Sequence, residues 1–462
     1  MQYEIVVPFE GEGEGSDELT WGQVAFWHCM RDSGQSATMG GVAPMPDGST
    51  VENVVDMLRY LISRHQSLRT RLEFGPDGEI RQVCSASGEV SLRITEAGEA
   101  DPAEVAEQIC REFAQRNFDY RNEWPVRMAA ITQRGRVTHV VAMYLHLALD
   151  AGGLDAMLAD LFSRDPVTGE PAGPLTGATP LEQARLQRGP AARRQSAAAL
   201  AHLEQVMRTA TPKWFGAPRR AGEPRFSMIR YSSPALALAV ARIAAEQSVN
   251  SSSALLATFA VGLARFTGDN PVVAMLMVSN RFRPRLATSV SSLVQISPYL
   301  IDVGGISLGE AVARARTSLL HTYKSAYYDH SEQEWVIDRV SRELGHDFDF
   351  CAMYNDRRKD EPLPGDWTPA TDQQIRDAVS ASSWVWEHPA DMSDRKLFVN
   401  VDDPPGALEL VVSADSRYFD VPEILGLVRG IEAAAVEAAL TPQAPTLVAT
   451  QSAGRIAAVA TR

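Results

Sequence analysis

Apolar residues recur at helical spacing in several parts of the chain. Between residues 51 and 64, the valine, leucine and isoleucine positions follow one another at intervals of three and four, which places them on one face of a helix. The same reasoning predicts helices over residues 103–116, 308–326 and 421–440. A further helix is expected to start at the serines 251–253, which can cap its first turn, and to stop at Gly268.

Strand-like patterns lie between these helices. Residues 72–83 read as a hairpin, because two apolar stretches flank the turn sequence GPDG. A short run of apolar residues at 272–278 predicts a buried strand, and residues 396–401 and 408–413 predict a pair of strands. Helices and strands are thus mixed along the whole chain.

The most strand-like run is VTHVVAMYLHLAL, residues 137–149, which contains no glycine or proline. Its continuous apolar character predicts a strand buried on both faces. Because successive side chains of a strand point to opposite faces, one face should carry Leu145, Leu147 and Leu149, and the other Tyr144, His146 and Ala148. Asp150 and two glycines then end the strand, and a helix should follow from Leu154.

A segment rich in Pro, Gly, Ala and Thr, residues 163–195, predicts a linker between two parts of the chain. The order of helices and strands before it recurs loosely after it, which indicates two α+β lobes. We therefore expect one lobe at residues 1–175, a second at residues 176–445, and a flexible tail at residues 446–462.

Composition narrows the functional classes. The 462 residues carry a formal net charge of −14, which argues against a nucleic-acid partner, since binding of a phosphate backbone needs a basic surface. The N-terminus lacks the basic and apolar regions of a signal peptide, and no apolar run approaches the length of a membrane helix. The four cysteines form no C-x-x-C pair. These features predict a cytoplasmic protein without a membrane partner.

Candidate chemistry lies in the stretch LHLALDA, residues 145–151, which resembles the HHxxxDG motif of the condensation domains of non-ribosomal peptide synthetases. Five other blocks resemble segments of that family in the same order and at about the same spacing. They are LTWGQVAFWHCM (19–30), RHQSLRTRL (64–72), NFDY with WPVRM (117–128), SNRFRPRLATSVSSLVQISPYLIDV (279–303) and ADSRYFD (414–420). Two motif positions depart from the family: Leu145 replaces the first histidine and Ala151 replaces the glycine.

The resemblance implies a fold and a reaction. The fold would be two chloramphenicol-acetyltransferase-like lobes in a V shape, with a tunnel between them that carrier proteins approach from opposite mouths. The reaction would be acyl transfer from a carrier-bound thioester to an amine or alcohol. Since the sequence has no room for an adenylation domain, we expect a stand-alone condensation enzyme that acts in natural-product, including antibiotic, biosynthesis.

The resemblance also assigns roles to residues. His146 takes the place of the family's catalytic histidine. Imidazole can accept a proton near neutral pH, which suits attack of a nucleophile on a thioester. Asp150 and Arg281 match an ion pair that supports the loop, and Gly152 and Gly153 are expected to supply the backbone freedom lost at Ala151.

The sequence does not indicate a serine hydrolase, a nucleotide-binding loop or a zinc site. It contains neither a G-x-S-x-G serine elbow nor a Walker loop, and no histidine lies at zinc-ligand spacing from a cysteine. We therefore expect no metal and no cofactor of its own, with the phosphopantetheine arm presented by a peptidyl or acyl carrier protein. The acceptor would be a small molecule or a second carrier-bound group.

Two alternatives remain open at this point. One is a catalytically inactive condensation-like module that recruits carrier proteins or tailoring enzymes. The other is a coenzyme A-dependent acyltransferase of the same superfamily.

Overall fold

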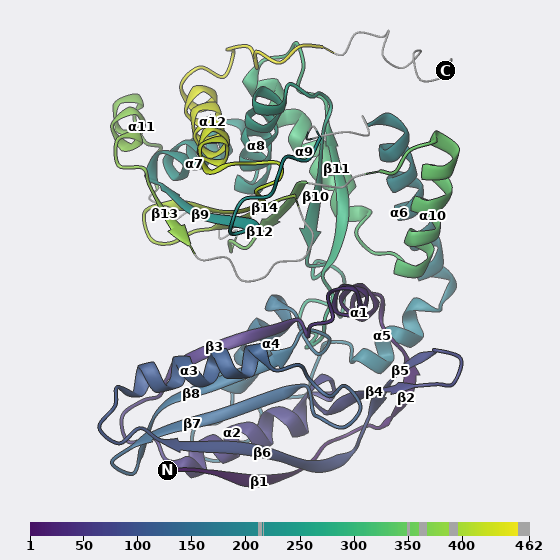
Figure 1. Ribbon diagram of the computed structural model, residues 1–462, viewed down its shortest axis with the longest axis vertical. Coiled ribbons are helices and arrows are strands. Elements are labelled where there is room, and N and C mark those ends of the chain that lie inside the picture. The colour runs from purple at the N-terminus through teal and green to yellow at the C-terminus, as the bar shows by residue number, and fades with distance from the viewer. Residues whose placement is uncertain (211–214, 216, 349–351, 360–366, 388–395, 451–462) are drawn as a thin grey trace. The chain divides into compact units, whose positions relative to one another are not determined.

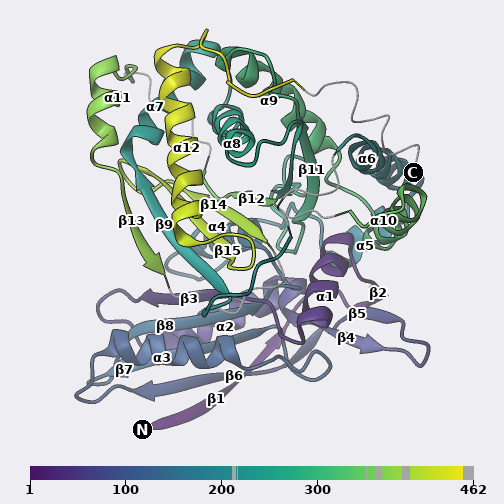
Figure 2. The same ribbon diagram turned by 45° about the horizontal axis from the view of Figure 1, so that its top comes forward.

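The computed structural model describes residues 1–450 except 211–214, 216, 349–351, 360–366 and 388–395. Its chain forms two compact units (Figures 1 and 2). Unit 1 comprises Met1–Ser196, Ser279–Gln295 and Tyr327–Ser331, and unit 2 comprises the remaining residues. Each unit is described by itself.

Unit 1 contains a five-stranded sheet in the order β1-β6-β7-β8-β3 and a three-stranded sheet in the order β2-β5-β4. Its elements are β1 (Gln2–Glu10), β2 (Gly15–Glu18), α1 (Trp21–Ser33), β3 (Thr38–Pro44), α2 (Val51–Arg64), β4 (Thr70–Phe74), β5 (Ile80–Cys84), β6 (Ser87–Glu96), α3 (Pro102–Gln115), β7 (Val126–Gln133), β8 (Arg136–Leu145), α4 (Ala151–Phe162) and α5 (Pro180–Gln187).

The five-stranded sheet is covered on both faces. Side chains of α2 and α4 pack on one face, and those of α3 pack on the other, along β7, β8 and β3. Strand β8 therefore buries Val140 on the first face and Val141 on the second. This confirms the predicted strand with two buried faces, although β8 ends at Leu145 instead of residue 149.

Unit 2 contains a seven-stranded sheet in the order β11-β10-β12-β14-β15-β9-β13. Helices α7, α8 and α12 pack against one another (Figure 1). Its elements are most of α6 (Pro190–Thr209) and α10 (His330–Leu344), with β9 (Phe226–Ser233), α7 (Pro234–Gln247), α8 (Ser251–Thr267), β10 (Val272–Val278), β11 (Gln295–Ile301), α9 (Leu308–Lys324), β12 (Ala352–Asp356), α11 (Asp372–Val379), β13 (Ser383–Glu387), β14 (Leu397–Asp402), β15 (Leu408–Asp415) and α12 (Val421–Leu440).

The predicted linker is partly wrong. Within residues 163–195 the structure forms α5 and the start of α6, each of which begins with a proline at its first position. Proline is well tolerated there, because the first N–H groups of a helix have no partner within the helix. The prolines therefore start helices here instead of breaking them.

The compact units also differ from the expected lobe boundary. Residues 176–196 belong to unit 1, and so do the distant segments 279–295 and 327–331. Of the expected tail, residues 446–448 are packed: Thr446 donates its backbone N–H to Ile306, and Gly305 donates to Val448. Residues 451–462 lie outside the described part. Among the described cysteines, Cys29, Cys84 and Cys110 are free thiols, and Cys351 is outside the described residues. No described helix has the length and apolar character needed to cross a membrane.

Candidate active site

His146 lies directly after the last residue of β8. Its backbone N–H donates to the carbonyl of Ala37 (2.9 Å), and the N–H of Ala148 donates to Leu145 (2.8 Å), which closes a tight turn. Strand geometry stops at this turn, so the predicted alternation fails beyond it. Leu145 and Leu147 share one apolar cluster as expected, but Leu149 packs in the other cluster with Tyr144 and Ala148.

Asp150 fixes the end of the turn. It is the N-cap residue of α4, and its side chain is 1% exposed. One carboxylate oxygen accepts the backbone N–H of Gly153 (2.8 Å), and the other accepts those of Leu293 (2.8 Å) and Val294 (3.0 Å). These three hydrogen bonds compensate the buried charge of the Asp150 carboxylate. They indicate that Asp150 stabilises the turn.

Arg281 completes the predicted ion pair. Its Nη2 lies 2.5 Å from an oxygen of Asp150, and both residues belong to unit 1. The same guanidinium donates to the carbonyls of Ser289 (2.7 Å) and Ser291 (3.1 Å). The arginine therefore binds the segment 279–295 to the start of α4.

Gly152 and Gly153 lie where other groups approach the backbone of α4 closely. Both lie in the first turn of α4 with no left-handed backbone. A Cβ on Gly152 would approach Nε of Arg281 to 2.2 Å, and one on Gly153 would lie 2.9 Å from the carbonyl of Ser291. They leave space for the arginine, and Ala151 is the first residue of the helix.

The imidazole of His146 is half-buried and stacks on the ring of Phe26, with ring centroids 3.7 Å apart and planes at 19°. Of its two nitrogens, only Nδ1 is buried without a hydrogen-bond partner. Burial lowers the pKa of His146, and the Asp150 carboxylate and nearby backbone groups offset only part of this effect. The ring is thus held neutral near pH 7, the form that can accept a proton. The sequence match covered Phe26 but did not single it out.

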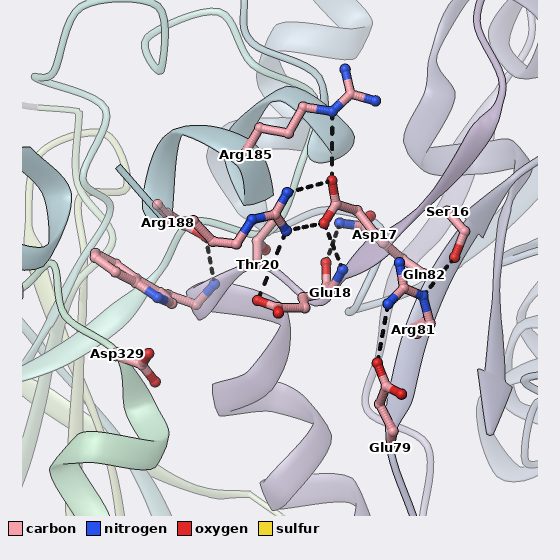
Figure 3. Close-up of polar contacts among 12 residues, drawn as sticks. Ser16, Asp17, Glu18, Thr20, Glu79, Arg81, Gln82, Arg185, Arg188 and Asp329 are labelled. Atoms are coloured by element: carbon pink, nitrogen blue, oxygen red, sulfur yellow. Dashed lines mark hydrogen bonds and ion pairs between the residues drawn. The ribbon is translucent and has the colours of Figure 1, made fainter. Parts of the chain in front are cut away.

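Helix α1, which carries Phe26, is anchored at its N-terminus. Thr20 and Gln23 form a reciprocal capping box, and the backbone N–H of Trp21 donates to Gln187 of α5 (3.0 Å). Nearby, Arg185 of α5 and Arg188, which follows the last residue of α5, both point toward the carboxylate of Asp17 on β2 (Figure 3). The hydrogen bond from Arg188 lowers the pKa of Asp17.

Two hollows border helix α1 in unit 1. A cavity of about 20 Å³, bordered by Gln23, Leu145 and Leu147, has room for about one water molecule. On another face of α1, a hollow of about 350 Å³ is lined by Trp21, Trp27 and residues of α5. Within unit 1, the described residues place no three metal-ligating side chains together, although the rings of His28 and His330 lie 4.9 Å apart.

Residues 18–164 match the sequence profile of the family described as Condensation domain. No curated protein matches the chain in sequence.

Solved structures match nearly the whole chain. SgcC5 from Streptomyces globisporus, in complex with a naphthyl ethanediol and sucrose, is 20% identical, with a TM-score of 0.67 over 93% of this chain and 100% of its own. The condensation domain of the monacolin K polyketide synthase MokA is 14% identical (TM-score 0.69; 94% and 100%). The X-domain bound to OxyB from teicoplanin biosynthesis is 15% identical (TM-score 0.66; 95% and 96%). The chain therefore has the mixed α/β condensation-domain fold, and its N-terminal third carries the sequence signature of that family.

We predict that Asp150→Asn destabilises the protein. Removal of the charge leaves Arg281 buried without its counter-ion, and breaking one member of a buried pair typically costs about 3–5 kcal/mol. Chemical denaturation of the variant measures this loss. Asp56→Asn is the control, because Asp56 pairs with Arg59 on an exposed helix surface, where ion pairs contribute little. If Asp150→Asn abolished turnover at unchanged stability, Asp150 would have a catalytic role instead.

If His146 acts as a general base, its pKa predicts how turnover depends on pH. Because burial lowers it below the ordinary value of about 6.5, the neutral, proton-accepting form persists to mildly acidic pH. Turnover should therefore fall only as pH drops through a midpoint below about 6.5. A pH–rate profile measures the midpoint, and an acid limb centred above 7 would contradict the prediction.

Proposed function

We propose that the protein transfers an acyl or aminoacyl group from a thioester on a carrier protein to an amine or alcohol. The observation that carries the proposal is His146 itself: a neutral imidazole on a turn that Asp150 and Arg281 hold, in a condensation-domain fold. The fold alone would not assign catalysis. The position of a proton acceptor on the matched motif supports it.

The reaction requires the protein to orient two reactants and to transfer one proton. A thioester is already activated, so the C–S bond breaks as a C–N or C–O bond forms, and the acceptor's proton passes to the departing thiolate. His146 would take that proton from the attacking nitrogen or oxygen and return it to sulfur. The phosphopantetheine arm is then part of the donor substrate, and the chain's own contribution is orientation and proton transfer.

Within this proposal, an acceptor with a hydroxyl group would depend most on His146. The similar SgcC5 structure contains a naphthyl ethanediol, a molecule with two hydroxyl groups. An alcohol is a weaker nucleophile than a neutral amine and depends more on a base. We expect His146 to matter more for ester than for amide formation.

A non-catalytic role is the second candidate. The X-domain in complex with OxyB has the same fold, and an analogous module here would recruit a carrier protein or tailoring enzyme. A coenzyme A-dependent acyltransferase would use the same histidine with a different donor. Assays with carrier-bound and coenzyme A-bound donors distinguish these candidates.

The test measures product by intact-protein mass spectrometry. Acyl-loaded carrier proteins and the matching acyl-coenzyme A thioesters are offered as donors, with an amine or a diol as acceptor. The proposal expects turnover from the carrier-bound donors, without added ATP and in the presence of chelator. Carrier binding without turnover would favour the recruiting module, and turnover from coenzyme A alone would favour the third candidate.

His146→Ala should reduce turnover by roughly 10²–10⁴-fold, the usual contribution of a positioned acid–base group. His139→Ala is the matched control, because His139 lies on β8, the strand that ends just before His146, and pairs only with its neighbour Thr138 among the contacts described for its ring. A His146→Ala protein that works at the wild-type rate would show that His146 is only a packing residue.

A further inference from the structure

The turn that carries His146 lacks one polar side chain of the HHxxxDG motif that it resembles. Leu145 stands at the position of the first histidine of that motif. Leu145 is 4% exposed and packs in an apolar cluster with Leu19, Met30, Leu72, Phe118 and Leu147. It therefore offers no hydrogen bond to the neighbouring imidazole. Nδ1 of His146 is buried, and none of the described residues forms a hydrogen bond of ordinary geometry with it.

Helix α1 supplies the contacts that the turn itself lacks. Phe26 stacks on the imidazole of His146 at 3.7 Å between centroids. One helical turn earlier, Nε2 of Gln23 lies 3.4 Å from the carbonyl of Leu147 and donates to it. Residues at i and i+3 share a helix face, so α1 contacts two successive residues of the turn from one side.

Several contacts hold the first turn of α1 in place. This turn is fixed by the capping box of Thr20 and Gln23 and by the bond from Trp21 to Gln187. At Gly22 the backbone of α1 approaches Ser292 so closely that a Cβ would lie 2.2 Å from the Ser292 carbonyl oxygen. The segment that carries Arg281 thus packs on the same helix that carries Phe26.

From these contacts we propose that Phe26 is a positioning residue for His146. The parallel ring restricts rotation of the imidazole about its Cβ–Cγ bond, because turning the imidazole would drive its edge into the face of Phe26. The edge of the imidazole stays free to exchange a proton. This inference rests on the proposed function for its catalytic consequence, but the stacking can be measured without any turnover.

Phe26→Leu tests the proposal, because leucine keeps an apolar side chain and removes the aromatic face. Misplacement of a reacting group by about 1 Å can cost about 10²-fold in rate, so we expect kcat to fall about 10–100-fold with KM changed less than about threefold. Phe26→Tyr retains the face and should restore at least half of the wild-type kcat.

A spectroscopic signature accompanies the kinetics. In wild-type protein labelled at histidine, the ring protons of His146 should resonate upfield through the ring current of Phe26, with the signal assigned from its loss in His146→Gln. Phe26→Leu should return these protons toward the positions of an unstacked histidine. Phe74→Leu is the matched control, because Phe74 packs in the same apolar cluster and contacts Trp27 instead of His146.

The outcomes separate this inference from the proposed function. If Phe26→Leu keeps the wild-type kcat, or loses no more activity and stability than Phe74→Leu, the positioning role is wrong. If the wild-type protein has no turnover but shows the upfield signals and their loss in Phe26→Leu, the proposed function fails while the positioning of the ring stands. Absence of an upfield signal in the wild type would overturn the inference directly.

Discussion

The charge of Asp150 is the constraint on which the candidate site depends. A carboxylate that is 1% exposed must be compensated, and here one guanidinium and three backbone N–H groups do so. These partners come from two segments far apart in sequence, the start of α4 and residues 281–294. The carboxylate therefore fixes the position of the turn that carries His146 and the position of the segment that covers it. The glycines of α4 are a consequence, since any side chain on Gly152 would occupy the space of the arginine.

The main elements of the fold could be predicted from the sequence. The helices over Val51–Arg64 and Val421–Leu440 have the predicted bounds, because their apolar spacing and caps are local signals. The helix that ends before Gly268 was also predicted, and the glycine there has the left-handed conformation (φ 77°) that favours it. The prediction from apolar residues was wrong where an apolar run continues past the end of a strand. The apolar run through Leu149 looks like a strand, but the turn at His146 ends β8 at Leu145, and Asp150 then caps the next helix.

The part of the candidate site that rests on residues of the resembled motifs could be predicted. The contacts that depend on tertiary packing could not. The Asp150–Arg281 pair follows from the resemblance and is present. The stacking of Phe26 on His146 brings together residues 120 positions apart in sequence, and nothing in the spacing of an aromatic residue on an amphipathic helix tells which partner it meets. The space that Gly152 leaves for Arg281 could not be predicted either, since a sequence shows that a glycine is present but not what approaches it.

The composition of unit 1 has a consequence for how the protein is made. Its N-terminal 196 residues are synthesised first, but the segments 279–295 and 327–331 complete it only after much of unit 2 has been translated. Arg281, the partner of Asp150, is synthesised 131 residues later. Until then a nascent chain holds a carboxylate that cannot be buried favourably, and loop closure over this distance makes the contact slow to form. Unit 1 therefore cannot reach its final packing during translation as an independent N-terminal domain would, and a fragment that ends at residue 196 would lack the groups that neutralise its own core.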